Sequence, residues 1–270
     1  MGDATQRVDS AEREQPGAAL SGPGGIKRGQ TNVIKYLKRI RPWVNRTLVP
    51  YSQVGNAPVT SAHLFPWIAE IIRDLPAIQA EADTILLNRM AVPPFRDFAP
   101  GHERIVSEDD WRSFFFWGYG YPVPENLVRC PRTAQAVSKV PGLVSAIYSV
   151  VAPGAHIGRH RGVSKAIMTA HIGLRVPKEA EKCRMDVDGH EVVWRVGEAA
   201  VLDDTYPHEV WNETDETRVL LLIQFQRPMR QPGRFLASIV IWVVRRSSFV
   251  QRARKNLAHW EAAFAAAERA

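Results

Sequence analysis

The chain of 270 residues has little cysteine, no long apolar run and two long stretches without acidic residues. Its two cysteines, Cys130 and Cys183, are too few for a disulfide framework, so we expect free thiols in a reducing compartment. The first residues lack the apolar segment of a secretory signal. No run reaches the roughly 20 apolar residues that a membrane-spanning helix needs. Together these absences favour a cytoplasmic protein.

Acidic residues are missing from residues 26–69 and again from residues 227–260, although both stretches are rich in lysine and arginine. The whole chain carries a formal net charge of +7 and has a pI near 9.6. Such a balance favours an anionic partner. Because no basic and aromatic nucleic-acid motif is present, we expect no nucleic acid as partner. The remaining candidates for the anionic partner are a membrane surface and a small acid.

Composition divides the chain into four parts. Residues 1–30 are rich in glycine, alanine and charge, which predicts a disordered tail. Residues 31–110 predict a helical and loop extension that packs on the core. Residues 111–230 predict the main β-rich domain. Residues 231–270 predict basic amphipathic helices.

The extension contains two helical patterns. Basic and apolar residues alternate before Pro42, which predicts a short basic amphipathic helix that this proline stops. Such a helix would either lie on an anionic membrane or pack on the domain. Residues 63–90 repeat apolar side chains near the 3.6-residue spacing, and Pro76 would kink this helix or split it in two. Its expected role is to cover a sheet.

The domain reads as a series of short strands separated by glycine and aspartate turns. Apolar patterns predict strands at residues 144–152, 167–176, 182–187, 191–196, 199–202 and 218–225. The aromatic segment 111–121 predicts either a buried core strand or one wall of an apolar substrate channel. The expected fold class is mainly β with flanking helices, a double-stranded β-helix of the jelly-roll or cupin-like kind.

Two histidines beside turns, 48 residues apart, carry the chemistry of this domain. His160 begins the triplet His-Arg-Gly, and His208 begins the run His-Glu-Val-Trp-Asn. Neutral imidazoles bind iron, zinc, copper or nickel when a sheet brings them together. A usual non-haem iron site adds a carboxylate, but the residue two positions after His160 is Gly162, which cannot ligate. The site would have two histidines plus water or a distant carboxylate; Asp203 and Asp204 are expected to be turn residues.

Arg218 leads into an apolar run on the last predicted strand. A charge at the start of a buried strand costs free energy unless it is paired. Its partner is either the carboxylate of an anionic cosubstrate, which matches the guanidinium fork, or an acidic residue of the preceding turn. His171 in mid-strand is either a satisfied core histidine or a site residue. Ser149 is either an ordinary strand serine or a hydroxyl that binds the same anion.

Taken in order, the motifs of this region resemble the aspartyl/asparaginyl β-hydroxylase family of Fe(II)- and 2-oxoglutarate-dependent oxygenases. These motifs are Pro153-Gly154, His160-Arg-Gly162, His171-Ile-Gly-Leu174, Trp194, Asp203-Asp204, His208-Glu-Val-Trp-Asn212, Arg218 and Arg227-Pro228. The resemblance covers residues 111–230 and continues more weakly to residue 260. It includes bacterial relatives that hydroxylate acyl chains of lipid A or ornithine lipids. Members of this branch also lack the carboxylate ligand, so Gly162 agrees with the family.

The resemblance implies a hydroxylase that uses Fe(II), 2-oxoglutarate and O₂ to hydroxylate an unactivated carbon. It implies that His160 and His208 bind the iron. It implies that Ser149 and Arg218 hold the distal carboxylate of 2-oxoglutarate, and that His171 meets the carboxylate nearer the metal. No general base is required, so no catalytic residue is assigned beyond the metal ligands.

Thr169 is the one departure from the family's motifs. The family has an arginine here, two residues before the strand histidine, which pairs with a carboxylate of cosubstrate or substrate. A threonine cannot replace a bidentate cation, and Lys165 or Arg161 would have to substitute. The substrate is either an acyl chain of a membrane lipid or an aspartyl or asparaginyl residue of a peptide or a small acid. The alternative from another class is a non-catalytic cupin-like binding protein.

The C-terminal part favours the lipid. Residues 235–244 are mostly apolar and are followed by two arginines. Ten residues are too few to span a bilayer and fit an interfacial or a buried helix. A second helical pattern with basic residues follows. We favour peripheral contact with an anionic membrane over packing on the core, because basic charge and tryptophans flank the domain at both ends. The expected location is the cytoplasm, with the inner face of the membrane as an option.

Overall fold

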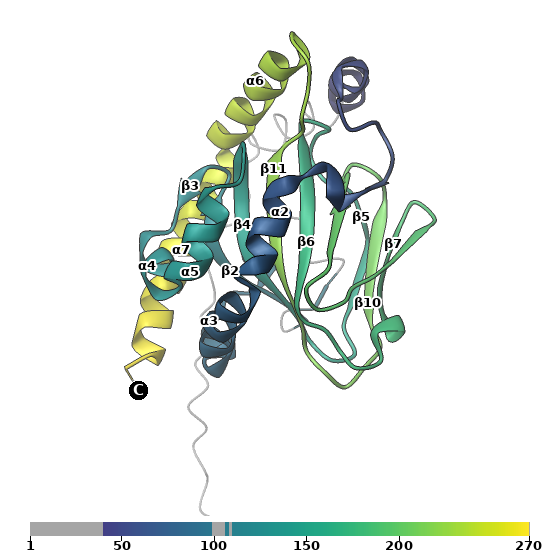
Figure 1. Ribbon diagram of the computed structural model, residues 1–270. Helices are drawn as coiled ribbons and strands as arrows, with labels where there is room; N and C mark the ends of the chain where they lie inside the picture. The colour runs from purple at the N-terminus through teal and green to yellow at the C-terminus, as the bar shows by residue number, and fades with distance from the viewer. Residues whose placement is uncertain (1–39, 99–105, 108–109, 270) are drawn as a thin grey trace, which may run out of the picture.

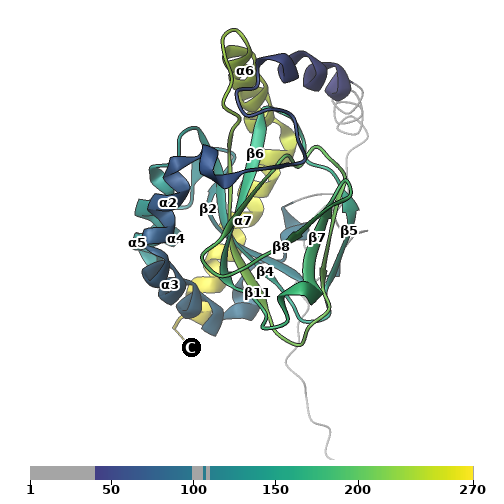
Figure 2. The ribbon, with the colours of Figure 1, turned by 45° about the vertical axis from the view of Figure 1, so that its right-hand side comes forward.

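The computed structural model describes residues 40–98, 106–107 and 110–269. The expected tail, residues 1–30, lies outside this part of the chain. In the described part, two antiparallel sheets face each other and helices cover one of them from outside (Figures 1 and 2). This arrangement of sheets confirms the predicted jelly roll with flanking helices.

Within the described residues the larger sheet has seven strands in the order β1-β9-β6-β11-β4-β2-β3, and the smaller has four in the order β5-β10-β7-β8. The larger sheet consists of β1 (Val59–Thr60), β2 (Trp111–Gly118), β3 (Tyr121–Pro122), β4 (Leu143–Val151), β6 (Ile167–Arg175), β9 (Ala199–Leu202) and β11 (Arg218–Gln226). The smaller sheet consists of β5 (His156–His160), β7 (Cys183–Val187), β8 (His190–Val193) and β10 (His208–Asn212).

The strands that carry the two histidines differ from the sequence interpretation. The apolar pattern predicts a loop at His160 and gives no strand at His208. The structure instead ends β5 at His160 and begins β10 at His208, and the two residues are direct partners across the antiparallel pair. Both strands are short and mix polar with apolar residues, so their pattern is weak. The sheet, more than local propensity, makes them strands.

The long central strands are buried on both faces, and alternate side chains enter different cores. On β6, Met168, Ala170 and Ile172 pack toward the helices. The residues between them, Thr169 and His171, point the other way, toward the smaller sheet. The same alternation applies on β4 and β11 and directs their polar residues into the space between the sheets.

Helices α2 (Pro66–Arg73), α3 (Leu75–Leu87), α4 (Pro124–Arg129) and α5 (Pro131–Ser138) cover the outer face of the larger sheet (Figures 1 and 2). Buried side chains such as Ile71 and Ile78 join the core beneath them. The helical pattern over residues 63–90 is therefore split, as one alternative for Pro76 predicts. The break falls at Asp74, and Pro76 lies in the first turn of α3, where it is tolerated.

The other helices extend the molecule at one end. Residues 40–48 are helical, so Pro42 does not stop this helix as predicted. Helix α6 (Gly233–Arg246) projects beyond the larger sheet, and α7 (Ser248–Ala267) returns along it (Figure 1). No described helix is both long and apolar enough to cross a membrane.

Candidate active site

A cavity of about 440 Å³ lies between the two sheets and α7. Its volume is typical of small-molecule sites, which measure roughly 300–1,000 Å³. The cavity is lined by Ser149 on β4, His160 on β5, His171 on β6, His208 on β10 and Arg218 on β11. The structure thus brings together all five predicted site residues from five different strands, and their roles as ligands stay predictions.

The imidazole rings of His160 and His208 lie with their centroids 4.1 Å apart and their planes at 63°. The Nδ1 atom of His160 is 2.8 Å from the Gly158 carbonyl oxygen, and that of His208 is 2.9 Å from the Tyr206 carbonyl oxygen. A carbonyl only accepts, so each neutral ring carries its proton on Nδ1 and its lone pair on Nε2. Such bonds to the far nitrogen fix the ring and the tautomer of a metal ligand.

No cluster of three or more histidine, cysteine, aspartate or glutamate residues that could hold a metal occurs in the described part of the chain. The structure gives a reason at Gly162. Its N–H donates to the Asp204 carbonyl oxygen at 2.6 Å, and a Cβ on residue 162 would come within 2.6 Å of the Asp204 Cβ. The turn that carries Asp204 therefore leaves no room for a side chain at residue 162, so this position contributes no carboxylate.

Asp203 and Asp204 both lie in the turn between β9 and β10, as predicted, but they differ in role. Asp203 is fully buried, accepts from the Thr205 N–H and forms ion pairs with Lys165 and Arg227. Asp204 lines the cavity, a placement that the sequence interpretation missed. Burial raises the pKa of the Asp204 carboxyl to about 6.

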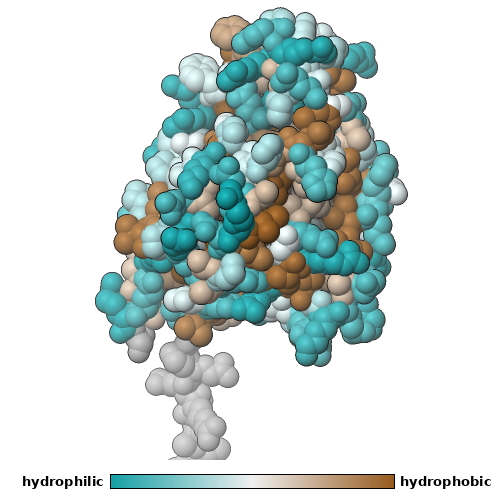
Figure 3. Space-filling model, in the orientation of Figure 1, coloured by the Kyte–Doolittle hydropathy of each residue, from teal (hydrophilic) through white to brown (hydrophobic). Residues whose placement is uncertain are grey.

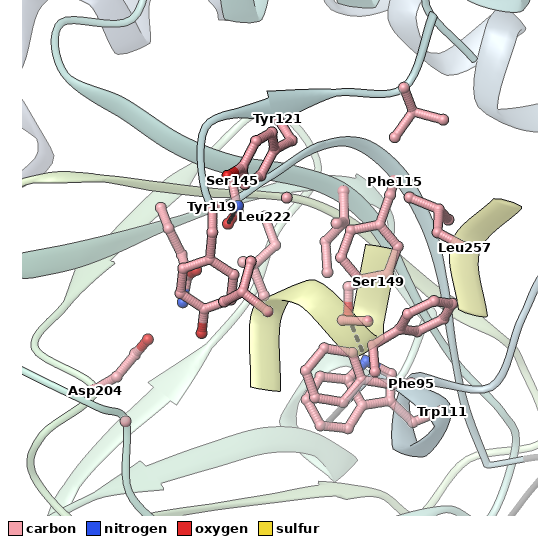
Figure 4. A pocket seen from close by; sticks show the side chains of 18 of the residues that line it. Phe95, Trp111, Phe115, Tyr119, Tyr121, Ser145, Ser149, Asp204, Leu222 and Leu257 are labelled. Atoms are coloured by element: carbon pink, nitrogen blue, oxygen red, sulfur yellow. Dashed lines mark hydrogen bonds between the residues drawn. The ribbon is translucent and has the colours of Figure 1, made fainter. Parts of the chain in front are cut away.

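Thr169 is the partner of Asp204. Its hydroxyl donates to the Asp204 carboxyl, and Figure 4 shows the Tyr119 hydroxyl on the side of its ring that faces the same group. Where the resemblance implies an arginine, this chain therefore pairs a threonine with a half-buried carboxyl. Lys165 does not replace that arginine, because its Nζ atom binds Asp203 at 2.7 Å. Arg161 lines the cavity but is exposed at its mouth.

Arg218 is only 3 % exposed and its Nε atom has no hydrogen-bond partner among the described residues. One terminal nitrogen donates to the Ser149 hydroxyl at 3.3 Å, and the guanidinium lies 4.5 Å from the centroid of the Trp194 ring. Burial lowers the pKa of Arg218 to about 10, so it is charged at neutral pH.

The acidic residues of the preceding turn are not the partners of this guanidinium. Glu216 accepts from the Lys178 N–H at 2.7 Å, and in the described part of the chain no ion pair joins Arg218 to residue 215 or 216. A buried cation without an anion is costly. The geometry therefore favours the first alternative, a bound anion.

Ser149 and His171 flank this guanidinium. The Ser149 hydroxyl accepts from the Trp111 indole N–H at 3.0 Å, drawn as a dashed line in Figure 4, which fixes its orientation. His171 is buried, and its Nδ1 atom has no partner within the described structure. Burial, helped by the charges of Arg218 and His208, lowers the pKa of His171 to about 3. A neutral imidazole and a guanidinium, both with an unpartnered buried nitrogen, indicate that a polar ligand completes the site.

The rest of the cavity is apolar. Phe95 stacks on Trp111 with ring centroids 3.8 Å apart, and Phe115, Leu222 and Leu257 of α7 continue the wall (Figure 4). On β2, Phe114 and Phe116 instead pack into the core under the helices. One face of β2 is therefore buried core, as the first alternative predicts, and its other face lines the cavity; that this cavity is a substrate channel stays a prediction.

A jelly roll whose cavity brings two paired histidines and a buried arginine together has the architecture of a cupin-like protein, a fold that suits a metal-dependent oxygenase. The profile described as Aspartyl/Asparaginyl beta-hydroxylase matches residues 72–228. An ornithine lipid ester-linked acyl 2-hydroxylase of Rhizobium tropici is 36% identical over 230 residues, which are 85% of this chain and 82% of that protein. The aspartyl/asparaginyl beta-hydroxylase of Homo sapiens is 26% identical over 140 residues, 50% of this chain but 18% of that protein.

A solved prolyl-4-hydroxylase of Pseudomonas putida has a TM-score of 0.34 at 19% identity, over 60% of this chain and 99% of that one. The extent of the profile match and the identity to the R. tropici protein together decide the family. The chain belongs to the aspartyl/asparaginyl β-hydroxylase family of Fe(II)- and 2-oxoglutarate-dependent hydroxylases.

Proposed function

We propose that this hydroxylase acts on an unactivated carbon in the acyl chain of a membrane lipid, with Fe(II), 2-oxoglutarate and O₂. The observation that carries the proposal is the mixed lining of the cavity. It contains His160, His208 and Arg218 and, in addition, many aromatic and aliphatic side chains, among them Phe95, Phe115, Leu222 and Leu257. A dicarboxylate suits the polar residues and an alkyl chain suits the apolar ones. The acyl 2-hydroxylase of R. tropici supports a lipid substrate.

The polar residues have separate tasks in this proposal. His160 and His208 would hold the iron through Nε2, since backbone carbonyls fix their Nδ1 protons. Arg218 and Ser149 would bind the distal carboxylate of 2-oxoglutarate, and His171 the carboxylate nearer the metal. When bound, iron with 2-oxoglutarate and O₂ supplies the oxidising power that converts a C–H bond into C–OH.

The apolar residues would orient the chain and exclude water. Trp111 and Phe115 present their rings to the cavity, and α7 closes it with Leu257. Excluding water protects the oxidising chemistry from side reactions. Thr169, in place of the family's arginine, removes a cation that an acidic side chain would need, which favours an acyl chain over an aspartyl residue.

We also propose the cytoplasmic face of the membrane as the place of action. Cys130 and Cys183 are both free thiols, as expected in a reducing compartment. Two long stretches without acidic residues give the chain the positive charge that anionic lipids attract.

The test is an assay of the full chain with Fe(II), 2-oxoglutarate and two acceptors, a bacterial lipid extract and a peptide that contains aspartate and asparagine. Succinate release that depends on the lipid, with an acyl chain heavier by one oxygen in the mass spectrum, is the expected result. His208→Ala should abolish both signals. Hydroxylation of the peptide and of no lipid would refute the lipid assignment.

A non-catalytic binding protein gives a different pattern. Such a protein would bind iron yet consume no 2-oxoglutarate with any acceptor, whether His208 is present or not. Metal binding by equilibrium dialysis, measured beside the turnover assay, separates this outcome from an inactive preparation.

A further inference from the structure

Helix α6 turns an apolar face to the solvent. Phe235 is 62 % exposed and Trp242 is 54 % exposed, and Ile239 and Val243 are exposed beside them. These positions are separated by four, three and one residues, so they share one side of the helix. Large apolar side chains gathered on one exposed face mark an interaction surface.

The opposite side of α6 is fixed to the body of the protein. Ala237 is buried in a small core that includes Leu48, and Val44 packs against the same core. Gly233 approaches the Tyr51 ring so closely that a Cβ would collide with it. The exposed face therefore belongs to a helix whose other side is packed against the body of the protein.

The helix at residues 40–48 lies at the same end of the molecule. Both helices rise above the sheets in Figures 1 and 2, and Figure 3 shows apolar side chains among hydrophilic ones at this end. Trp43 on this helix is 71 % exposed. The Arg41 guanidinium donates to the Gly162 carbonyl oxygen at 3.1 Å, which ties the helix to the segment that carries His160.

The charged side chains on and next to α6 are basic. Arg230, Arg234, Arg245 and Arg246 flank it, and residues 227–260 contain no acidic residue. The Arg246 guanidinium lies 4.1 Å from the centroid of the Trp242 ring. Apolar and aromatic side chains beside basic ones are what an interfacial helix needs on an anionic bilayer.

We infer that Phe235, Ile239, Trp242 and Val243 form a docking surface for an anionic lipid bilayer, into whose outer layer their side chains insert. The charge selects this occupant over a second copy of the chain. In a symmetric dimer the same patch meets itself, so the arginines around it would repel one another.

The docking surface adjoins the cavity. The Arg245 guanidinium at the end of α6 lies 4.2 Å from the centroid of the Tyr121 ring, and Arg254 of α7 lies 3.8 Å from the same ring. Tyr121 lines the cavity (Figure 4). If the proposed function holds, an acyl chain would pass from the bilayer into the cavity beside Tyr121; docking itself does not depend on that function.

The experiment is flotation of the full chain with vesicles of phosphatidylcholine and with vesicles in which part of the lipid is phosphatidylglycerol. Binding to the anionic vesicles that weakens in high salt is expected. Phe235→Ser with Trp242→Ser should weaken it by about tenfold or more, because the inserted apolar area is lost. Leu87→Ser, an exposed leucine at the end of α3, is the matched control and should leave binding unchanged.

Charge-reversal variants test the role of the arginines. Arg230→Glu with Arg234→Glu should abolish selectivity for anionic vesicles, whereas Arg195→Glu should not.

A turnover assay tests whether docking delivers the substrate. The Phe235/Trp242 variant should turn over 2-oxoglutarate normally with detergent-dispersed lipid and poorly with lipid in vesicles. Equal binding to both vesicle types, equal binding by variant and control, or a dimer in sedimentation that this variant breaks would overturn the docking surface. Vesicle binding without any turnover would overturn the proposed function alone.

Discussion

The surroundings of Arg218 decide what its replacement does. In Arg218→Met, loss of the guanidinium should weaken 2-oxoglutarate binding by about 2–5 kcal/mol, the usual effect of removing one partner of a buried charged pair. The unliganded protein should melt at the same or a higher temperature, because an unpaired buried charge is gone. Calorimetric titration and thermal melts measure the two effects. Arg195→Met, at an exposed arginine, is the control, and a lower melting temperature with unchanged affinity would contradict the prediction.

The Thr169 hydroxyl donates a hydrogen bond to the Asp204 carboxyl. Thr169→Val therefore tests whether Thr169 only stabilises the fold or also binds 2-oxoglutarate. We expect a loss of about 0.5–1.5 kcal/mol in the free energy of unfolding, because a half-buried carboxyl loses its hydrogen-bond donor. The KM for 2-oxoglutarate should stay close to that of the wild type, since Arg218 and Ser149 are untouched. Urea unfolding and turnover assays test this beside Thr84→Val, an exposed helix position. A large rise in KM with unchanged stability would make Thr169 a cosubstrate ligand.

Burial raises the pKa of the Cys130 thiol to about 12 and that of Cys183 in the same direction. Thiolates are the reactive form, and an unfolded cysteine has a pKa near ~8.5. At pH 8 the native chain should therefore react with a thiol reagent orders of magnitude more slowly than the chain in denaturant. Above the unfolded value the unfolded state loses protons that the native state keeps, so stability should fall as pH rises from about 9. Rapid labelling of two thiols in the native protein would be incompatible with this burial.

At the scale of the element, β2 offers a matched pair of phenylalanines. Phe114→Ala removes a ring from the core under the helices and should cost about 3–5 kcal/mol of stability. Phe115→Ala widens the cavity. It should lower the free energy of unfolding by less than Phe114→Ala does, and it should shift the preferred acyl-chain length or the hydroxylated position. Chemical unfolding and mass spectra of the products distinguish the two. Equal effects of both substitutions on product and stability would mean that the strand does not divide core from cavity.

The elements also show what a sequence pattern can and cannot predict. Strands such as β4, β6 and β11 have long apolar runs, and the pattern predicts them because burial on both faces demands such residues. Strands β5 and β10 mix polar with apolar residues and are formed through pairing within the smaller sheet, β5 with β10 and β10 with β7. The motifs therefore identified these histidines while the apolar pattern missed the strands that hold them.

Asp204 shows the same limit for the site. A turn is readable from two adjacent aspartates, but the direction of each side chain depends on residues far along the chain. Gly162, some forty positions earlier, has no side chain and so lets the turn approach closely, and the Thr169 hydroxyl on another strand donates a hydrogen bond to the carboxyl. Neither contact can be predicted from the spacing of residues near Asp204 in the sequence. By contrast, the five site residues were predicted from family motifs, which do not depend on knowing any long-range contact.

At the scale of the molecule, the two sheets contribute different halves of the site. His160 and His208 belong to the smaller sheet, whereas Ser149, His171 and Arg218 belong to the larger. A metal with bound 2-oxoglutarate would connect the sheets, so the two ligands together should raise the melting temperature more than the sum of each alone. At a hundred times the dissociation constant the gain is about 2.7 kcal/mol, or roughly 5–10 °C. Scanning calorimetry with an iron or manganese salt measures it.

Chelation should reverse this shift, and His208→Ala should lack it although the fold persists. Arg218→Met should keep the metal shift and lose the part due to 2-oxoglutarate. A shift that is equal in wild type and His208→Ala would show that the metal binds elsewhere.

The contact between Gly162 and Asp204 also limits how the metal site could be re-engineered. A side chain at residue 162 would collide with the neighbouring turn, so one substitution is not enough to place a carboxylate ligand there. The turn would have to move away, and that would disturb Asp203 with its ion pairs to Lys165 and Arg227. A third protein ligand at this position therefore requires several coupled substitutions, the first of which lowers the stability of the chain.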